Sequence, residues 1–131
     1  MQKRMEVSFP GNKRVDCHWG GLTVGTDQLK RNGGDETAPQ PFDLFFAAIA
    51  TCAGISALDF LQTRDLPTVG LRLVLTAELN KEVKRYDKVH IEITPPPELD
   101  RKWYDEMQFE AADCTVKRHI MNPPQFETSI A

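Results

Sequence analysis

The sequence contains few cysteines, and their spacing excludes two common classes of small protein. Its 131 residues include three cysteines, an odd number, with no CxxC spacing. A small disulfide-rich secreted protein needs a denser and even set. HxxxH spacing is also absent, and the adjacent Cys17 and His18 lie on opposite faces of an alternating segment, which argues against a structural zinc site. We therefore expect no metal, no cofactor and a reducing, cytoplasmic location.

The sequence also lacks an excess of charge of either sign. Its formal net charge is -3, with acidic and basic residues interspersed, so we expect neither nucleic acid nor an anionic membrane as a partner. The first residues lack the apolar core of a secretory signal, and we expect no membrane anchor. Without repeats, low-complexity tracts or a linker, residues 1–131 are predicted to form one domain with its own core.

The longest apolar stretch, residues 41–61, contains no charge between Asp43 and Asp59. A helix without a polar face belongs in a protein core or in a membrane. A membrane span needs about 20 predominantly apolar residues, and this uncharged run is shorter, rich in alanine and interrupted by small polar residues. The stretch therefore predicts a central helix buried on all sides, with Cys52 near its middle.

Alternating apolar residues predict strands on both sides of this helix. Residues 5–9, 15–19 and 22–24 alternate and are separated by turn residues, which predicts a three-stranded meander followed by a polar loop. After the helix, apolar residues alternate along 71–79, Leu79 included, and along 89–93. One dry face and one wet face indicate an antiparallel hairpin that packs against the helix.

The C-terminal third predicts two helices and a short strand. Apolar residues recur at helical spacing over 99–107, as expected for an amphipathic helix with its apolar side in the core. Asp113 is a favourable N-cap for a second helix beginning at Cys114. Two prolines end that helix, and residues 126–130 could add a last strand.

The three cysteines differ in their surroundings. Cys114 is predicted at a helix start, where free amide groups favour a thiolate, and Lys117 and Arg118 follow at positions that share or flank its face. Cys52 lies in an alanine-rich helix, where a cysteine is either an inert core residue or part of a site. Cys17 lies on the apolar face of a strand and is interpreted as a small buried hydrophobe.

The order of these elements, together with the two cysteine contexts, resembles a known family. Residues 41–48 leading to Cys52, residues 114–116 and the closing residues 122–127 are similar to the OsmC/Ohr family of osmotically induced and organic-hydroperoxide-resistance proteins. The resemblance covers essentially the whole chain. It implies an α+β fold in which antiparallel sheets wrap around a long buried central helix. It also implies an intimate homodimer with a site at each subunit interface.

The resemblance implies a stress-response function in hydroperoxide detoxification. Cys52 would be the peroxidatic thiolate and Cys114 the resolving cysteine, and a cellular dithiol would reset the pair. An apolar pocket for an organic hydroperoxide, or for another small apolar ligand, would be formed by Phe42, Phe45, Phe46 and Trp103. The alternative is a protein of the same fold that binds a small molecule or senses redox state without turnover.

One position departs from the family pattern. The peroxidases of the family carry a glutamate ten residues before the first cysteine, paired with an arginine, whereas this chain has Phe42 there. The nearest acid is Asp43, which either tunes the thiolate or is an acid favoured in the first turn of a helix. The cationic partner is best placed at Arg31, with Lys30 and Arg14 as alternatives.

Overall fold

The structure, a computed structural model, describes residues 1–131. The chain divides into two compact units, Met1–Phe46 and Ala47–Ala131, each described by itself below. Helix α1, Pro41–Thr63, begins in the first unit and continues through the second. The helix predicted over residues 41–61 is therefore confirmed and extends two residues further. The prediction of one domain over 1–131 stays a prediction.

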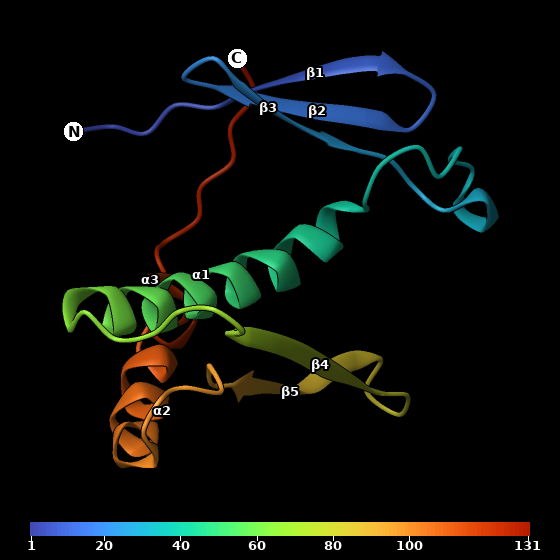
Figure 1. Ribbon diagram of the computed structural model, residues 1–131. Coiled ribbons are helices and arrows are strands. Elements are labelled where there is room, and N and C mark those ends of the chain that lie inside the picture. The colour runs from blue at the N-terminus through green and yellow to red at the C-terminus, as the bar shows by residue number, and fades with distance from the viewer. The chain divides into compact units, whose positions relative to one another are not determined.

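The first unit contains the predicted meander. Strands β1 (Glu6–Gly11), β2 (Arg14–Trp19) and β3 (Leu22–Thr26) form an antiparallel sheet in the order β1-β2-β3 (Figure 1). Gly20 and Gly21 join β2 to β3 with φ angles of 50° and 78°. Both values lie in the left-handed region that glycine enters without steric cost, which explains the tight turn.

The loop after β3 is organised by the carboxylate of Asp27, which is fully buried. Its Oδ1 accepts the backbone N–H of Gln28 at 2.7 Å. Its Oδ2 accepts the backbone N–H of Thr37 at 3.0 Å and the Thr37 hydroxyl at 2.6 Å. The backbone N–H of Asp27 donates to Pro39 O at 3.0 Å. The predicted loop is confirmed, and it includes a short 3-10 helix, η1 (Lys30–Asn32).

Asp27 is expected to make stability depend on pH in the acid range. Hydrogen bonds from the hydroxyl and the backbone of Thr37, the hydroxyl bond first, lower the pKa of Asp27 from 3.8 to about 2. Because the folded pKa is the lower one, the ionised carboxylate stabilises the fold above about pH 4, and this contribution is lost as pH falls towards 2. Urea unfolding of Asp27→Asn should give a lower midpoint at pH 7 and a smaller change in midpoint between pH 4 and pH 2.

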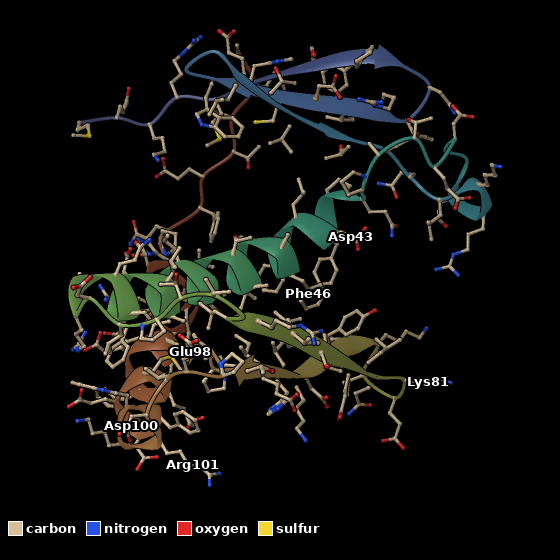
Figure 2. All side chains as sticks on the ribbon, viewed as in Figure 1. Asp43, Phe46, Lys81, Glu98, Asp100 and Arg101 are labelled. Atoms are coloured by element: carbon tan, nitrogen blue, oxygen red, sulfur yellow. The ribbon has the colours of Figure 1, made fainter.

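The exposed carboxylate of Glu98 provides a control for the Asp27 prediction (Figure 2). Glu98→Gln removes one carboxylate without disturbing the loop, and its urea midpoints should follow those of the wild type at every pH. An Asp27→Asn variant that kept the full acid sensitivity of the wild type would show that other carboxylates cause it.

In the second unit, α1 is buried on one side only. Ala53, Ala57, Phe60 and Leu61 are buried, whereas Ile55 remains 50% exposed. Within this chain α1 is therefore buried along one face only, and the expectation of burial on all sides is not met. By length and composition α1 could also cross a membrane, a test that the core helix of a soluble protein passes equally.

Strands β4 (Arg72–Asn80) and β5 (Arg85–Thr94) form the predicted antiparallel hairpin (Figure 1). The apolar residues of its dry face lie opposite one another in the pairs Leu73↔Ile93, Leu75↔Ile91 and Ala77↔Val89. Cross-strand apolar pairs of this kind are the unit that stabilises a sheet.

The far end of the hairpin differs from the prediction. The register shifts beyond Glu78, so that Leu79 pairs with Tyr86 and Asp87 has no opposite residue. Leu79 is 49% exposed and Val89 is 41% exposed, so the far end of the predicted dry face is not covered within this chain. Figure 2 shows Lys81 at the tip of the same hairpin, where charged residues surround the turn.

The C-terminal helices cover the end of α1. The predicted amphipathic segment forms a 3-10 turn, η2 (Arg101–Trp103), followed by α2 (Tyr104–Ala112), and α3 follows at Thr115–Met121. The core of the unit comprises the buried residues Phe60, Leu61, Leu99 and Met107. Leu71 and Ile93 pack against this core, so the hairpin meets the helices there.

The predicted last strand is absent. Residues 122–131 continue from α3 as an extended chain without ladder hydrogen bonds, and Phe126 and Ile130 are 86% and 96% exposed. A strand forms only when its backbone pairs with a neighbouring edge, and residues 122–131 pair with no strand of this chain.

Candidate functional site

Cys114 caps helix α3. It has an extended backbone conformation, with φ -112° and ψ 154°, and its Sγ accepts the backbone N–H of Lys117 at 3.4 Å. Asp113 instead ends α2. The predicted assignment was therefore wrong by one residue: the thiol occupies the N-cap position expected for the carboxylate, and Cys114 precedes the first helical residue. The Cys114 side chain is buried, with 3% exposure.

The Asp113 carboxylate is held by Arg118. The Arg118 guanidinium donates from Nε to Oδ1 at 2.8 Å and from Nη2 to Oδ2 at 3.3 Å, a two-point contact that fixes the relative orientation of both groups. The backbone N–H of Arg118 also donates to Cys114 O at 3.0 Å. The ion pair is thus attached directly to the residue that carries the buried thiol.

The pKa values of this pair show which groups lie around it. The hydrogen bond from Arg118 is the main cause that lowers the pKa of Asp113. The same hydrogen bond is the main cause that raises the pKa of Arg118, followed by the charge of Asp113, with smaller contributions from Cys114 and Cys52.

Cys52 lies in the middle of α1 and is half-buried. Its carbonyl oxygen accepts the Ser56 hydroxyl at 3.0 Å. A side chain added at the neighbouring Gly54 would meet no atom within 4 Å, so this part of the helix has open space beside it. Cys52 and Cys114 belong to the same unit, and both are free thiols in this structure.

The three predicted pocket phenylalanines form one aromatic cluster at the start of α1. The ring centroids of Phe42 and Phe45 are 5.5 Å apart, those of Phe42 and Phe46 are 5.0 Å apart, and those of Phe45 and Phe46 are 5.4 Å apart. Phe42 is 53% exposed and Phe45 40% exposed. An exposed aromatic cluster of this kind can receive an apolar molecule.

Trp103 belongs to the second unit, whereas the three phenylalanines belong to the first. Its ring lies 6.1 Å from that of Phe60 in an edge-to-face arrangement, and it packs against the core cluster of the second unit. These contacts give Trp103 a role in the core.

The predicted charged residues of the site lie in the first unit. Asp43 Oδ2 accepts the backbone N–H of Gln40 at 3.1 Å, and the Asp43 backbone N–H donates to Gln40 O at 3.0 Å. This reciprocal pair is typical of an acid in the first turn of a helix, as Figure 2 shows for Asp43 at the start of α1. Arg31 is exposed in η1, and Arg14 donates to Asp16 at 2.9 Å. The thiolate-tuning roles of Asp43 and Arg31 stay predictions.

Sequence reasoning did not identify the Asp113–Arg118 ion pair. It noted Arg118 as a neighbour of Cys114 and treated Asp113 as a helix cap. The signal that was missed is the spacing of two opposite charges around Cys114. Asp113 lies one residue before the cysteine and Arg118 lies four residues after it. Among residues 1–131 the structure contains no group of three or more His, Cys, Asp or Glu side chains able to hold a metal ion.

Two antiparallel sheets and a long apolar helix, with two free thiols in one unit, define an α+β protein with a candidate thiol site. Comparison with known proteins assigns it more narrowly. The sequence profile of the family of OsmC-like proteins matches residues 33–129. The chain therefore belongs to the OsmC-like family. No curated protein matches the chain.

Solved structures agree with this assignment. A protein from Psychrobacter arcticus 273-4, described as an osmotic stress induced and detoxification response protein, is 24% identical with a TM-score of 0.76, covering 90% of this chain and 88% of its own. An OsmC-like protein from Mycoplasma pneumoniae is 12% identical with a TM-score of 0.68, covering 94% and 89%. An organic hydroperoxide resistance protein OsmC from Legionella pneumophila is 17% identical with a TM-score of 0.59, covering 92% and 89%. The predicted OsmC-like α+β fold is confirmed.

Proposed function

We propose that this protein is a thiol-dependent peroxidase that reduces organic hydroperoxides through Cys52 and Cys114. Family membership, and a structural neighbour described as a predicted redox protein, support a stress-related redox role. The observation that carries the finer proposal is the pair of free thiols in one compact unit, one half-buried in α1 and one buried before α3. A half-buried first thiol can meet substrate, and a buried second thiol is protected from other oxidants.

The proposed reaction needs no cofactor. The Cys52 thiolate attacks the terminal oxygen of the hydroperoxide ROOH, the O–O bond breaks, and the alkoxide takes a proton to leave as ROH, while Cys52 becomes a sulfenic acid. The Cys114 thiol then attacks that sulfur, forms a disulfide and releases water. A cellular dithiol exchanges with the disulfide, returns both cysteines to thiols and is itself oxidised.

The aromatic cluster at the start of α1 supports an organic substrate. Phe42, Phe45 and Phe46 expose apolar ring surface, which binds a hydrocarbon group and offers no hydrogen bond to hydrogen peroxide. We expect an aryl or alkyl hydroperoxide to react faster than hydrogen peroxide for this reason.

The functional form proposed here is a homodimer. The exposed face of α1 carries Ala47, Thr51 and Ile55, which lie at four-residue spacing within the run that contains no charge. The Thr51 hydroxyl donates a hydrogen bond to Ala47 O at 2.7 Å. This hydroxyl therefore has a partner within the helix and does not need water when the face is covered. A long helix with such a face is normally covered by protein, and a second copy of the chain would supply that cover.

Stoichiometric oxidation of the reduced protein tests the peroxidase proposal. One equivalent of cumene hydroperoxide should remove two thiols per chain, and peptide mapping by mass spectrometry should find a Cys52–Cys114 disulfide with Cys17 still free. The third cysteine is an internal control because β2 holds it half-buried, in register with Val7 and Val24. Oxidation that leaves Cys52 reduced, or a disulfide through Cys17, would contradict the proposed pair.

The exposed phenylalanine cluster also favours a second candidate function, which is the binding of a small apolar molecule, or redox sensing, without turnover. This candidate replaces the first if Cys52 and Cys114 both remain reduced at a modest excess of hydroperoxide.

A further inference from the structure

His18 on β2 is bonded through both ring nitrogens to hydroxyl groups on the two neighbouring strands. Its Nε2 lies 2.7 Å from Ser8 Oγ on β1, and its Nδ1 lies 2.9 Å from Thr23 Oγ1 on β3. The strand register explains both contacts. Thr23 lies directly opposite His18, and Ser8 is two residues beyond Glu6, the residue opposite His18 on the other side. Direct and diagonal neighbours on one face of a sheet are within reach of each other.

The three bonded groups differ in their access to solvent. Ser8 and His18 are half-buried, whereas Thr23 is exposed. A surface pocket of about 380 Å³ is lined by His18, Thr23, Arg4, Glu6 and the turn between β2 and β3, whereas Ser8 lies outside this lining. A molecule in the pocket therefore meets the Thr23 hydroxyl and the ring to which that hydroxyl is bonded.

The hydrogen bonds give the two hydroxyl groups different roles. A neutral imidazole carries one N–H donor and one acceptor nitrogen. When Nε2–H of His18 donates to Ser8 Oγ, Nδ1 is the acceptor and receives the hydrogen bond from the Thr23 hydroxyl. A hydroxyl bonded to an imidazole that a third group orients is the arrangement that activates an oxygen nucleophile. The exposed member of the three, Thr23, is the one that a substrate can reach.

We propose that Thr23 is a nucleophile for acyl transfer from short, polar carboxylic esters, with His18 as its general base and Ser8 as a positioning residue. Thr23 Oγ1 attacks the ester carbonyl carbon, and its proton passes to His18 Nδ1. The bond from the carbonyl carbon to the alkoxy oxygen breaks, the proton returns to that oxygen, and the alcohol leaves an acyl group on Thr23. Water then attacks this acyl group through the same base, which releases the carboxylic acid and restores the hydroxyl.

The walls of the pocket define the kind of acyl group. Arg4 and Glu6 form an ion pair at 2.6 Å, and both side chains are exposed, so charges of both signs lie beside the pocket. Its volume is at the lower end of the range of ligand pockets, about 300 to 1,000 Å³. A long hydrocarbon chain gains little from charged walls, whereas a short acyl group with a polar end keeps its hydrogen bonds there.

The second sheet contains a matched threonine and histidine that lack the hydrogen bond. Thr76 on β4 lies directly opposite His90 on β5, both are exposed, and no hydrogen bond joins their side chains. Exposure and a neighbouring histidine are therefore the same for Thr76 and Thr23, and only the bonded ring differs. This pair gives a control within the same chain.

The test is reaction with p-nitrophenyl dimethylcarbamate, whose carbamoyl product resists hydrolysis, followed by peptide mapping with mass spectrometry. Thr23 should be labelled at least about 100-fold faster than Thr76, the lower range of a general-base effect. Mapping measures each site separately, so labelling of thiols or lysines does not disturb the comparison. Equal labelling of the two threonines, or a label on Ser8 in place of Thr23, would overturn the proposal, and this comparison requires no substitution.

Substitutions then separate the roles of the two partners. His18→Gln removes the base and should lower Thr23 labelling about 100-fold, whereas His90→Gln should leave it unchanged. Ser8→Ala should lower it about tenfold because the ring loses its orienting bond, and Ser8→Thr, which keeps a hydroxyl, should recover most of the rate. Unchanged labelling in His18→Gln would reject the histidine as base. Failure of Ser8→Thr to recover the rate would reject hydroxyl positioning.

The substrate class is tested by ester hydrolysis. The part of the rate that Thr23→Val removes should be larger for p-nitrophenyl hemisuccinate than for p-nitrophenyl octanoate, and the reverse order would reject a short, polar acyl group. The site lies in the first unit and uses neither Cys52 nor Cys114. It therefore stands or fails independently of the peroxidase proposal.

Discussion

Replacing Ile55 with glutamate is expected to convert the proposed dimer into a monomer, raising its dissociation constant at least about 100-fold. Ile55 is 50% exposed on α1, in the run without charge between Asp43 and Asp59. A carboxylate placed in a closed apolar interface loses its hydration without gaining a partner. In a symmetric dimer the substitution occurs twice, and about 2.7 kcal/mol in total is enough for a 100-fold change.

Sedimentation velocity across a range of protein concentrations would measure this change. Val69→Glu is the matched control, because Val69 is also an apolar side chain, 88% exposed, but lies in the loop before β4. It should sediment as the wild type does. A wild-type chain that is monomeric at about 50 μM, a concentration at which a stable dimer is expected to persist, or an Ile55→Glu dimer of unchanged affinity, would reject α1 as the contact.

The sequence was sufficient to predict α1 because one physical property determines it. An uncharged run flanked by acids at Asp43 and Asp59 has no polar face, so it must be covered by something. The same run could not show how much of the α1 surface is buried by other residues of this chain. Burial of Ala57 but exposure of Ile55 depends on tertiary packing, for which the sequence carries no local signal.

The alternation of apolar residues was likewise sufficient to predict the strands of the two sheets. It could not predict the bulge in β5 or the absence of a last strand. The pairs from Leu73↔Ile93 to Ala77↔Val89 follow from matching dry faces. The bulge at Asp87 adds one residue to β5 and shifts its register against β4, and a period of two cannot reveal such an insertion. The last strand predicted over residues 126–130 did not form, because a strand needs pairing with an edge elsewhere, which this short segment cannot reveal.

At the candidate site, residue preference gave a wrong cap for a clear reason. Aspartate is among the strongest N-cap residues and cysteine is not. A two-point bond to a guanidinium competes for the same carboxylate, and Arg118 provides one to Asp113. With Asp113 bound there, the Sγ of Cys114 receives the Lys117 N–H instead. Which donor binds the Asp113 carboxylate depends on where the side chains lie in the folded chain. The N-cap preference of a single residue type does not contain that information.

Cys52→Ser is expected to lower the rate of cumene hydroperoxide reduction, with dithiothreitol as the reductant, at least about 1,000-fold. A serine hydroxyl does not ionise near neutral pH, and no neighbouring base on α1 is placed to activate it, so the nucleophile is lost. Cys114→Ser removes only the resolving step. It should still react once with hydroperoxide, leaving a Cys52 sulfenic acid that dimedone traps.

Cys17→Ser provides the matched control for this pair, because it removes a half-buried thiol from β2 and should keep turnover within about twofold of the wild type. The two site variants differ in kind: loss of Cys52 abolishes the first turnover, whereas loss of Cys114 spares it and slows regeneration. If Cys52→Ser retained turnover while Cys114→Ser lost its first reaction, the roles would be exchanged, and the buried thiol held by the Lys117 N–H would be the one that meets the substrate. Equal loss in all three variants, including Cys17→Ser, would indicate a general effect of substitution and no specific thiol chemistry.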